Sequence, residues 1–403
     1  MSRRPIAVIA SRLFAPEVGA GAFRLTAMGT ALVRAGFDVS VLTTRPPKQA
    51  PSTPDPDGIR VRRWPVLRDG GGNVRGYVQY ASYDGPLILR MLFARYDVAV
   101  AESPPTTGIA VGLASILRRK KFIYYAADVW TDGVISMGAA RPIIAIMRAM
   151  ERWALRRATR IISVSDGVTE RLVTLGADPA RVVTVGNGVD TQIFNPDAGV
   201  ASPGERYFVY TGTMSEWQQP DVFVRAFARV ASQHPDISLR FFGQGVVEAD
   251  LRALADELIP GRVHFGGVVS PAESASWIRG ALGSLVSIVP GIGYDFARPT
   301  KTYAAAAVGT PVIFAGPDGG ATLVREGDLG LAVAFSETAV ADAMRRLITE
   351  ADDGTSERLR PERVAWANEN VSSSAVAHRV AGAVSEVLAE SGGRLGSGAS
   401  VAR

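Results

Sequence analysis

Short runs of apolar residues alternate with longer amphipathic segments along the whole chain. A short continuous apolar run is typical of a parallel strand buried on both faces. The segments between the runs place their apolar residues at helical spacing. This alternation predicts an α/β protein made of doubly wound units. Strands are expected at residues 5–11, 39–43, 59–64, 96–101, 122–126, 161–165 and 182–185, and at 207–211, 237–242, 263–266, 283–289, 311–314 and 330–335.

A polar stretch rich in proline and glycine interrupts this rhythm at residues 196–206. Its composition is typical of a linker, and the strand–helix alternation resumes after it. A chain of 403 residues also exceeds one ordinary domain. We therefore predict a first Rossmann-like domain at 1–195, the linker, and a second Rossmann-like domain at 207–370. Residues 371–390 are expected to form a helix, and the Gly/Ser-rich residues 391–403 a disordered tail.

Composition narrows the functional classes. The formal net charge of +5, from 44 basic and 39 acidic residues, is too small to indicate nucleic acid binding. The absence of cysteine excludes a disulfide scaffold and fits a reducing cytoplasm. The apolar run Ile6–Ala10 is too short for a signal peptide, and no run of apolar residues is long enough to span a bilayer. We expect a cytoplasmic enzyme.

Candidate functional residues of the first half lie where strands end. The loop before the first helix contains Gly19, Ala20 and Gly21, which let a ligand approach the backbone closely. Arg24 occupies the third glycine position of a dinucleotide fingerprint, so that motif is absent. Glu102 and Asp128 follow two other strands, at the edge where open α/β sheets bind ligands. The alternative for both acids is a helix cap or turn.

The second half contains a candidate phosphate site at residues 294–314. Pro299 suits the first turn of a helix, and the backbone N–H groups from Thr300 onward lie at its positive end. Arg298 and Lys301 add cationic side chains there. A helix that begins with cationic residues after a strand is a typical binding site for phosphate. An ordinary α/β connection with surface charges is the alternative.

One basic segment raises the question of membrane contact. Arg148, Arg152 and Arg156 recur every fourth residue in the helix expected near 141–160. Such a helix can rest on anionic lipid at the inner face of the cell membrane. It can equally be a solvated face over a core stripe. The cluster Arg118–Lys121 is a second basic group in the same half.

The chain resembles the retaining family 4 glycosyltransferases, which have the GT-B fold. Within that family it is most similar to transferases of bacterial polysaccharide and lipid-linked saccharide assembly. The resemblance covers nearly all of the chain. It is carried by the small-residue loop with Arg24, the string 186–190 before Phe194-Asn195-Pro196, the strand end Thr211-Gly212-Thr213, and residues 298–311.

The resemblance implies two Rossmann-like domains facing a cleft, with the last helix crossing back to the first domain. It implies a nucleotide-diphosphate sugar bound mainly to the second domain, near Gly319 and Gly320, and a saccharide, lipid-linked or small-molecule acceptor bound mainly to the first. Arg24 is then expected near the phosphates or the acceptor, and Asp128 is expected to orient the acceptor hydroxyl. Neither a metal nor a separate cofactor is implied, because cationic groups and helix starts neutralise the diphosphate.

The sequence departs from the family pattern at the donor site. Thr213 and Gln218 stand where many relatives have an arginine and a lysine, and Phe296 and Ala304 where they have two glutamates. The second glutamate contacts the nucleotide ribose in those relatives, so a dTDP-sugar or UDP-sugar held by Arg298, Thr300 and Lys301 is the expected donor. Two alternatives stay open: a degenerate, non-catalytic scaffold that binds a nucleotide or a partner, and a nucleotide-sugar epimerase-like enzyme.

Overall fold

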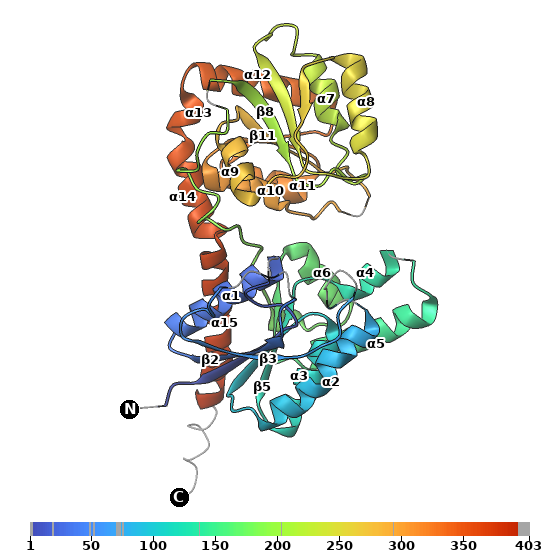
Figure 1. Cartoon of the computed structure of the whole chain (residues 1–403), viewed down its shortest axis with the longest axis vertical. Coiled ribbons are helices and arrows are strands. Elements are labelled where there is room, and N and C mark those ends of the chain that lie inside the picture. Colours follow the sequence, from blue (N-terminus) through green and yellow to red (C-terminus); the bar gives the residue numbers. More distant parts are fainter. Residues whose placement is uncertain are drawn as a thin grey trace, which may run out of the picture. The chain divides into compact units, whose positions relative to one another are not determined.

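A computed structural model describes residues 3–17, 20–47, 50, 53–69, 74, 76–136, 138–202, 204–292 and 294–393 (Figure 1). The chain divides into two compact units. Unit 1 comprises residues 1–186 and 376–403, and unit 2 comprises residues 187–375.

Unit 1 is built on a parallel sheet with the strand order β3-β2-β1-β4-β5-β6-β7. Its strands are β1 (Ile6–Ala10), β2 (Asp38–Thr44), β3 (Ile59–Trp64), β4 (Val98–Glu102), β5 (Lys121–Ala126), β6 (Arg160–Ser163) and β7 (Val182–Thr184). Its helices are α1 (Ala20–Arg34), α2 (Tyr77–Phe93), α3 (Pro105–Leu117), α4 (Trp130–Ser136), α5 (Arg141–Arg157), α6 (Asp166–Thr174) and most of α15 (Ser373–Gly393), with a 3₁₀ turn at Pro179–Arg181.

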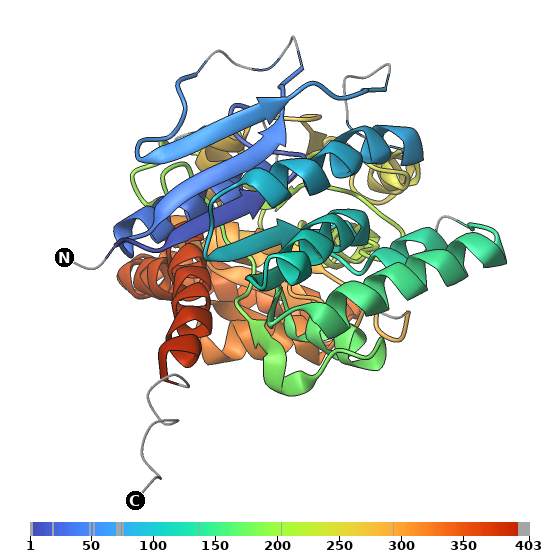
Figure 2. The same cartoon turned by 90° about the horizontal axis from the view of Figure 1, so that it is seen from below.

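Helices cover both faces of this sheet, as the buried apolar runs predict. α1 and α15 pack on one face, against residues such as Ile9 and Val100. α2, α3 and α5 pack on the other, against residues such as Val8 and Tyr124, and α3 lies between α2 and α5 (Figure 2). Within the described part of residues 45–58 there is no helix, so the β2–β3 portion of the second face has no helix of its own.

Unit 2 has a parallel sheet with the strand order β10-β9-β8-β11-β12-β13. Its strands are β8 (Arg206–Thr211), β9 (Ile237–Phe242), β10 (Val263–Phe265), β11 (Gly283–Ser287), β12 (Val312–Ala315) and β13 (Gly330–Val333). Its helices are α7 (Asp221–Ala228), α8 (Glu248–Leu258), α9 (Pro271–Arg279), α10 (Thr300–Val308), α11 (Asp318–Glu326), α12 (Glu337–Asp352), α13 (Thr355–Arg358) and α14 (Arg360–Asn370).

Each sheet has one point at which the strand order reverses direction. In unit 1 it lies between β1 and β4, and in unit 2 between β8 and β11. The connections that leave two such neighbouring strands run to opposite faces, and the crevice between them is where open α/β sheets bind ligands. The prediction of two doubly wound parallel sheets is therefore confirmed, and each sheet has one position that favours a site.

Several element boundaries differ from those expected. α1 begins at Ala20 rather than near Phe23, so Ala20 and Gly21 belong to its first turn. Pro299 precedes α10 as its N-cap, with an extended ψ of 132°, rather than lying inside the first turn. The division between the units falls after Gly186, and Val189 N–H, just beyond it, donates to Val371 O at 2.8 Å within unit 2.

The end of the chain also differs in detail. α15 continues to Gly393, so residues 391–393 of the expected tail are helical. Residues 394–403 of that tail lie outside the described residues. From Val376 onward α15 belongs to unit 1, where Val380 and Val384 are buried against the sheet. Within the described ranges, no helix combines the length and the apolar character needed to cross a bilayer.

Candidate functional site

In unit 1, an ion pair lies at the reversal point of the sheet. Glu102 ends β4, and Arg24 reaches it from α1 with 2.5 Å between Nη2 and Oε1. The hydroxyl of Ser11, the residue after β1, donates to Oε2 of Glu102 at 2.6 Å. Both sequence candidates are thus brought together, although they are 78 residues apart in the chain. The two strand ends and the first helix are tied at one point.

The positive charge of Arg24 is stabilised by its neighbours. Burial is the largest single effect and would lower the pKa of the guanidinium, but Glu102, Tyr125 and Asp128 together outweigh burial and the pKa is raised. The guanidinium carbon also lies 5.3 Å from the centroid of the Tyr125 ring. Gly21 lies over this pair, since a Cβ there would be 3.5 Å from Oε1 of Glu102. Gly19 lies outside the described residues, and the structure places Ala20 at the start of α1.

Asp128 follows β5 and is exposed, unlike Glu102. The pKa of its carboxyl is raised, first by desolvation from the surrounding protein. The positive charge of Arg24 acts in the opposite direction, and the negative charge of Glu102 adds to the rise. Asp128 is therefore an accessible carboxylate that is electrostatically coupled to the buried pair.

A residue that the sequence analysis missed fixes the backbone just after Asp128. Glu151, on α5, is fully buried and accepts hydrogen bonds from Trp130 N–H and Thr131 N–H, both at 2.9 Å. Its Oε2 also accepts from the Thr131 hydroxyl at 2.6 Å. Burial raises the pKa of this carboxyl, against the lowering effect of its hydrogen bonds. Glu151 thereby caps the start of α4. A signal existed, because Glu151 shares helical spacing with the core residues Met147 and Leu155.

In unit 2, the candidate site is organised by Lys301. Its ammonium donates to Thr211 O at 2.8 Å and to Thr213 O at 3.3 Å, where β8 ends. It also lies 4.1 Å from the centroid of the Tyr210 ring. Burial lowers the pKa of this amine to about 7. Carbonyl dipoles and the face of the Tyr210 ring solvate the ammonium only in part. An anion bound here would therefore interact with a positive charge that the protein does not neutralise.

The backbone at the end of β8 is shaped around that side chain. Gly212 has a φ of 107°, and a Cβ there would come within 2.8 Å of Lys301 Nζ. A Cβ on Gly243 or Gly245, in the loop after β9, would collide with the carbonyl oxygens of Gly212 and Met214. Glycine is thus required at these positions by close backbone approach.

The other donor-side candidates occupy different environments. Thr213 and Thr300 are exposed, and Arg298 is half-buried. Gln218 is only 3% exposed, and its Oε1 accepts from the Tyr210 and Ser215 hydroxyls at 2.9 and 3.1 Å. The side-chain oxygen of Gln218 is therefore hydrogen-bonded within unit 2.

Two glycines allow the first turn of α11 to pack closely against the loop before α10 and against the Phe314 ring. A Cβ on Gly319 would lie 2.4 Å from Asp295 O, and one on Gly320 would lie 2.3 Å from the Phe314 ring. The loop before α10 thereby packs on the start of α11. Phe296, in that loop, is exposed, whereas Ala304 is buried in the core on α10.

An aromatic pair borders the same edge of unit 2. The rings of Trp217 and Tyr294 stack with centroids 5.1 Å apart, and they come from the loops after β8 and β11. Val289 N–H donates to Trp217 O at 2.9 Å and holds those loops together. In the part of the chain that the structure describes, no group of three or more histidine, cysteine, aspartate or glutamate side chains is arranged to hold a metal ion.

The chain matches two family models that together cover most of its length. Residues 19–188 match the Glycosyl transferase 4-like domain, and residues 205–350 match Glycosyl transferases group 1. A curated relative, D-inositol 3-phosphate glycosyltransferase 2 of Catenulispora acidiphila, is 32% identical over 235 residues, which is 52% of this chain and 53% of that protein. The chain thus spans about half the length of the curated relatives it matches.

Solved structures show the same fold. Sucrose-phosphate synthase from Thermosynechococcus elongatus aligns with a TM-score of 0.69 at 19% identity, over 96% of this chain and 100% of that chain. The Anabaena protein HepE, in complex with UDP-glucose, aligns with a TM-score of 0.61 at 14% identity, over 94% and 99% of the two chains. These likenesses confirm the GT-B fold class expected from the sequence.

The Glu151 cap generates a stability prediction. Glu151→Gln replaces one acceptor oxygen by an amide donor that faces donors on Trp130 and Thr131. Urea denaturation should show the free energy of unfolding reduced by about 1–3 kcal/mol. Glu170→Gln, at an exposed position of α6, is the control and should change little. Equal stability of the two variants would contradict the capping role.

The depressed pKa of Lys301 generates a prediction about pH. Between the folded value of about 7 and the ordinary value of 10.5, the unfolded chain binds more protons at this site than the folded chain. The free energy of unfolding should therefore rise with pH across that window. In Lys301→Met, the free energy of unfolding should rise less steeply with pH than in the wild type. In Lys121→Met, at the start of β5, it should rise as steeply as in the wild type. Parallel pH profiles of wild type and Lys301→Met would show that the amine is not desolvated.

Proposed function

Because this chain belongs to the group 1 glycosyltransferases, we propose that it transfers a sugar from a nucleotide-diphosphate donor to an acceptor hydroxyl. The acceptor is a saccharide, a lipid-linked saccharide or a small molecule, in the assembly of a cell-surface glycan or glycoconjugate. The observation that carries the proposal is the desolvated ammonium of Lys301 at the reversal point of the unit 2 sheet.

The donor diphosphate is proposed to bind at the start of α10. Lys301 supplies a positive charge beside the end of β8, and Arg298 supplies a second one just before the helix. The first backbone N–H groups of a helix have no partner within it, and Pro299 provides no side-chain cap. These groups together stabilise a leaving diphosphate without a metal ion or other cofactor. HepE, a structural neighbour, is known in complex with UDP-glucose, which supports a nucleotide-sugar donor.

The transfer is proposed to retain the configuration of the sugar. The bond between the anomeric carbon and the diphosphate oxygen breaks, and the acceptor oxygen bonds to that carbon on the same face. The proton of the acceptor hydroxyl passes to the leaving phosphate oxygen, so the step needs no separate protein base. The role of the chain is then to orient the reactants and to stabilise developing negative charge.

In unit 1, Asp128 is proposed to accept a hydrogen bond from the acceptor hydroxyl. It is exposed after β5, beside the reversal point where Arg24 and Glu102 are paired. Arg24 is proposed to contact the acceptor or the phosphates with a guanidinium edge that Glu102 does not occupy. Glu102 is 7% exposed and holds Arg24 in place, so it acts as a positioning residue.

A lipid-linked acceptor would bring the chain to a membrane surface. Arg148, Arg152 and Arg156 are all exposed on α5 and are proposed as cationic contacts with anionic lipid.

The proposed donor site predicts which nucleotides stabilise the protein. Ala304 offers no carboxylate to the ribose, so dTDP, whose sugar lacks one hydroxyl, should bind more tightly than UDP or GDP. A thermal-shift panel with UDP, GDP, ADP and dTDP measures this. A ligand at 100 times its Kd stabilises the folded state by about 2.7 kcal/mol. Lys301→Met should abolish the shift, and Lys121→Met should preserve it.

The outcomes of that panel separate the alternatives. Equal or reversed affinities of dTDP and UDP would overturn the base preference alone. The absence of any shift, together with no turnover of any nucleotide sugar, would favour a degenerate scaffold over a transferase.

The proposed acceptor role of Asp128 predicts a loss confined to transfer. Asp128→Asn should lower kcat for sugar transfer roughly a hundredfold, as misplacement of a reacting group does. The nucleotide-induced thermal shift should stay unchanged, because the donor binds in unit 2. Asp132→Asn is the control, since that carboxylate pairs with Arg171 on the surface. Wild-type transfer rates in Asp128→Asn would remove Asp128 from the mechanism.

A further inference from the structure

Helices α2 and α3 pack side by side on one face of the unit 1 sheet (Figure 2). Their outer sides carry large exposed apolar side chains. Phe93 is 86% exposed and Leu117 is 71% exposed. On α2, exposed residues recur every fourth position from Tyr77 to Phe93, which forms one stripe along the helix. The large exposed side chains of this α2–α3 face are Tyr77, Val78, Leu89, Phe93, Leu113, Ile116 and Leu117.

The α2–α3 face carries no exposed acidic side chain. α3 contains no charged residue, and the one acid of α2, Asp84, is buried and accepts a hydrogen bond from the Thr107 hydroxyl at 2.7 Å. An ordinary surface helix turns a polar side to water. Two adjacent helices that both turn apolar side chains outward therefore mark an interaction surface.

Basic residues gather where the two helices end. Arg95 follows α2, and Arg119 and Lys121 belong to the basic segment after α3. In the same segment, Lys120 pairs with Asp97 at 3.3 Å, so its charge is partly compensated. The apolar face is thus bordered at one end by positive charge.

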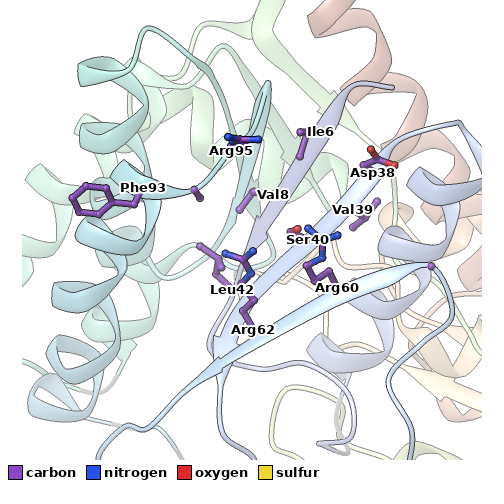
Figure 3. A pocket seen from close by; sticks show the side chains of 12 residues that line it. Ile6, Val8, Asp38, Val39, Ser40, Leu42, Arg60, Arg62, Phe93 and Arg95 are labelled. Atoms are coloured by element: carbon purple, nitrogen blue, oxygen red, sulfur yellow. The ribbon is translucent and has the colours of Figure 1, made fainter. Parts of the chain in front are cut away.

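A groove of about 570 Å³ lies beside the end of α2, and its charged lining residues are three arginines and one acid, Asp38 (Figure 3). It exists because no helix in the described part of residues 45–58 covers β2 and β3. Arg60 and Arg62 rise from β3 and Arg95 from the segment after α2, above a floor that includes Val8 and Leu42. Among the described residues, these three guanidinium groups have no ion pair and no hydrogen-bond acceptor.

We propose that the α2–α3 face docks on a bilayer that contains anionic lipids, and that the groove arginines take lipid phosphate groups. Apolar side chains beside unpaired cations match the boundary between headgroups and acyl chains. A second copy of this face would offer the arginines no acidic partner from either helix, so charge complementarity favours the lipid surface. This contact is independent of the donor chemistry and lies on other elements than the α5 arginines.

Co-sedimentation of the full chain with vesicles tests the proposal. Wild type should bind vesicles of phosphatidylcholine mixed with phosphatidylglycerol more tightly than vesicles of phosphatidylcholine alone. Leu89→Ser/Phe93→Ser should weaken this binding at least tenfold. Arg60→Gln/Arg62→Gln should weaken it by about fivefold for each charge removed, and the difference should shrink at high salt. The matched variant Arg34→Gln/Arg346→Gln, at exposed positions of α1 and α12, should bind nearly as wild type.

The controls and contrary results are distinct. Thermal unfolding and the nucleotide-induced shift should be unchanged in all variants, because every substituted side chain is exposed. No preference for phosphatidylglycerol, or an equal loss of binding in Arg34→Gln/Arg346→Gln and Arg60→Gln/Arg62→Gln, would overturn the proposal. So would light scattering that shows a wild-type dimer abolished by Leu89→Ser/Phe93→Ser, because the face would then join two copies.

Discussion

The unit 2 site depends on one half-buried positive charge. Lys301 reaches from the first turn of α10 to the two carbonyl oxygens at the end of β8, and this contact fixes the helix start against the strand. Gly212 has to be glycine because the ammonium occupies the space of a side chain. Removing an ammonium from water costs free energy, and the carbonyl dipoles offset this cost only in part. The folded chain therefore retains an unbalanced charge at the point where the fold favours a ligand.

The corresponding position of unit 1 has a different charge balance. There the cation, Arg24, is already neutralised by Glu102, and Ser11 completes the hydrogen bonds of the carboxylate. A compensated pair attracts an anion less strongly than Lys301 does, and it provides a rigid polar surface beside the exposed Asp128. The two halves thus repeat one architecture with different electrostatics, in keeping with the different reactants proposed for them.

Local sequence patterns predicted the elements of the fold and much less of the contacts between them. Apolar runs such as Ile6–Ala10 indicated parallel strands, and both sheets confirm that class. The start of α10 was also predictable, because proline favours the start of a helix locally. The pairing of Arg24 with Glu102 was not, since it joins residues 78 positions apart. The functional roles of both remain predictions.

Two other features, the apolar outer side of α2 and the inward-facing amide oxygen of Gln218, could not be predicted from the sequence for physical reasons. α2 is apolar on its outer side as well as its inner side, so it lacks the periodicity by which a surface helix is recognised. Gln218 follows a strand end, where a ligand contact is a fair expectation, yet its amide oxygen is bound by Tyr210 and Ser215. Only the packed structure decides whether such a polar side chain turns inward or outward.

The path of α15 has a consequence for synthesis. Its first residues belong to unit 2, where Ser373 N–H donates to Val189 O, and the rest completes the apolar core of unit 1. The part of that sheet face which α15 covers, beside α1, therefore stays uncovered until the last helix has left the ribosome. Unit 2 is a continuous segment that ends before that helix turns to unit 1, so it is complete earlier. The half of the protein that is made first is the last to be able to finish folding.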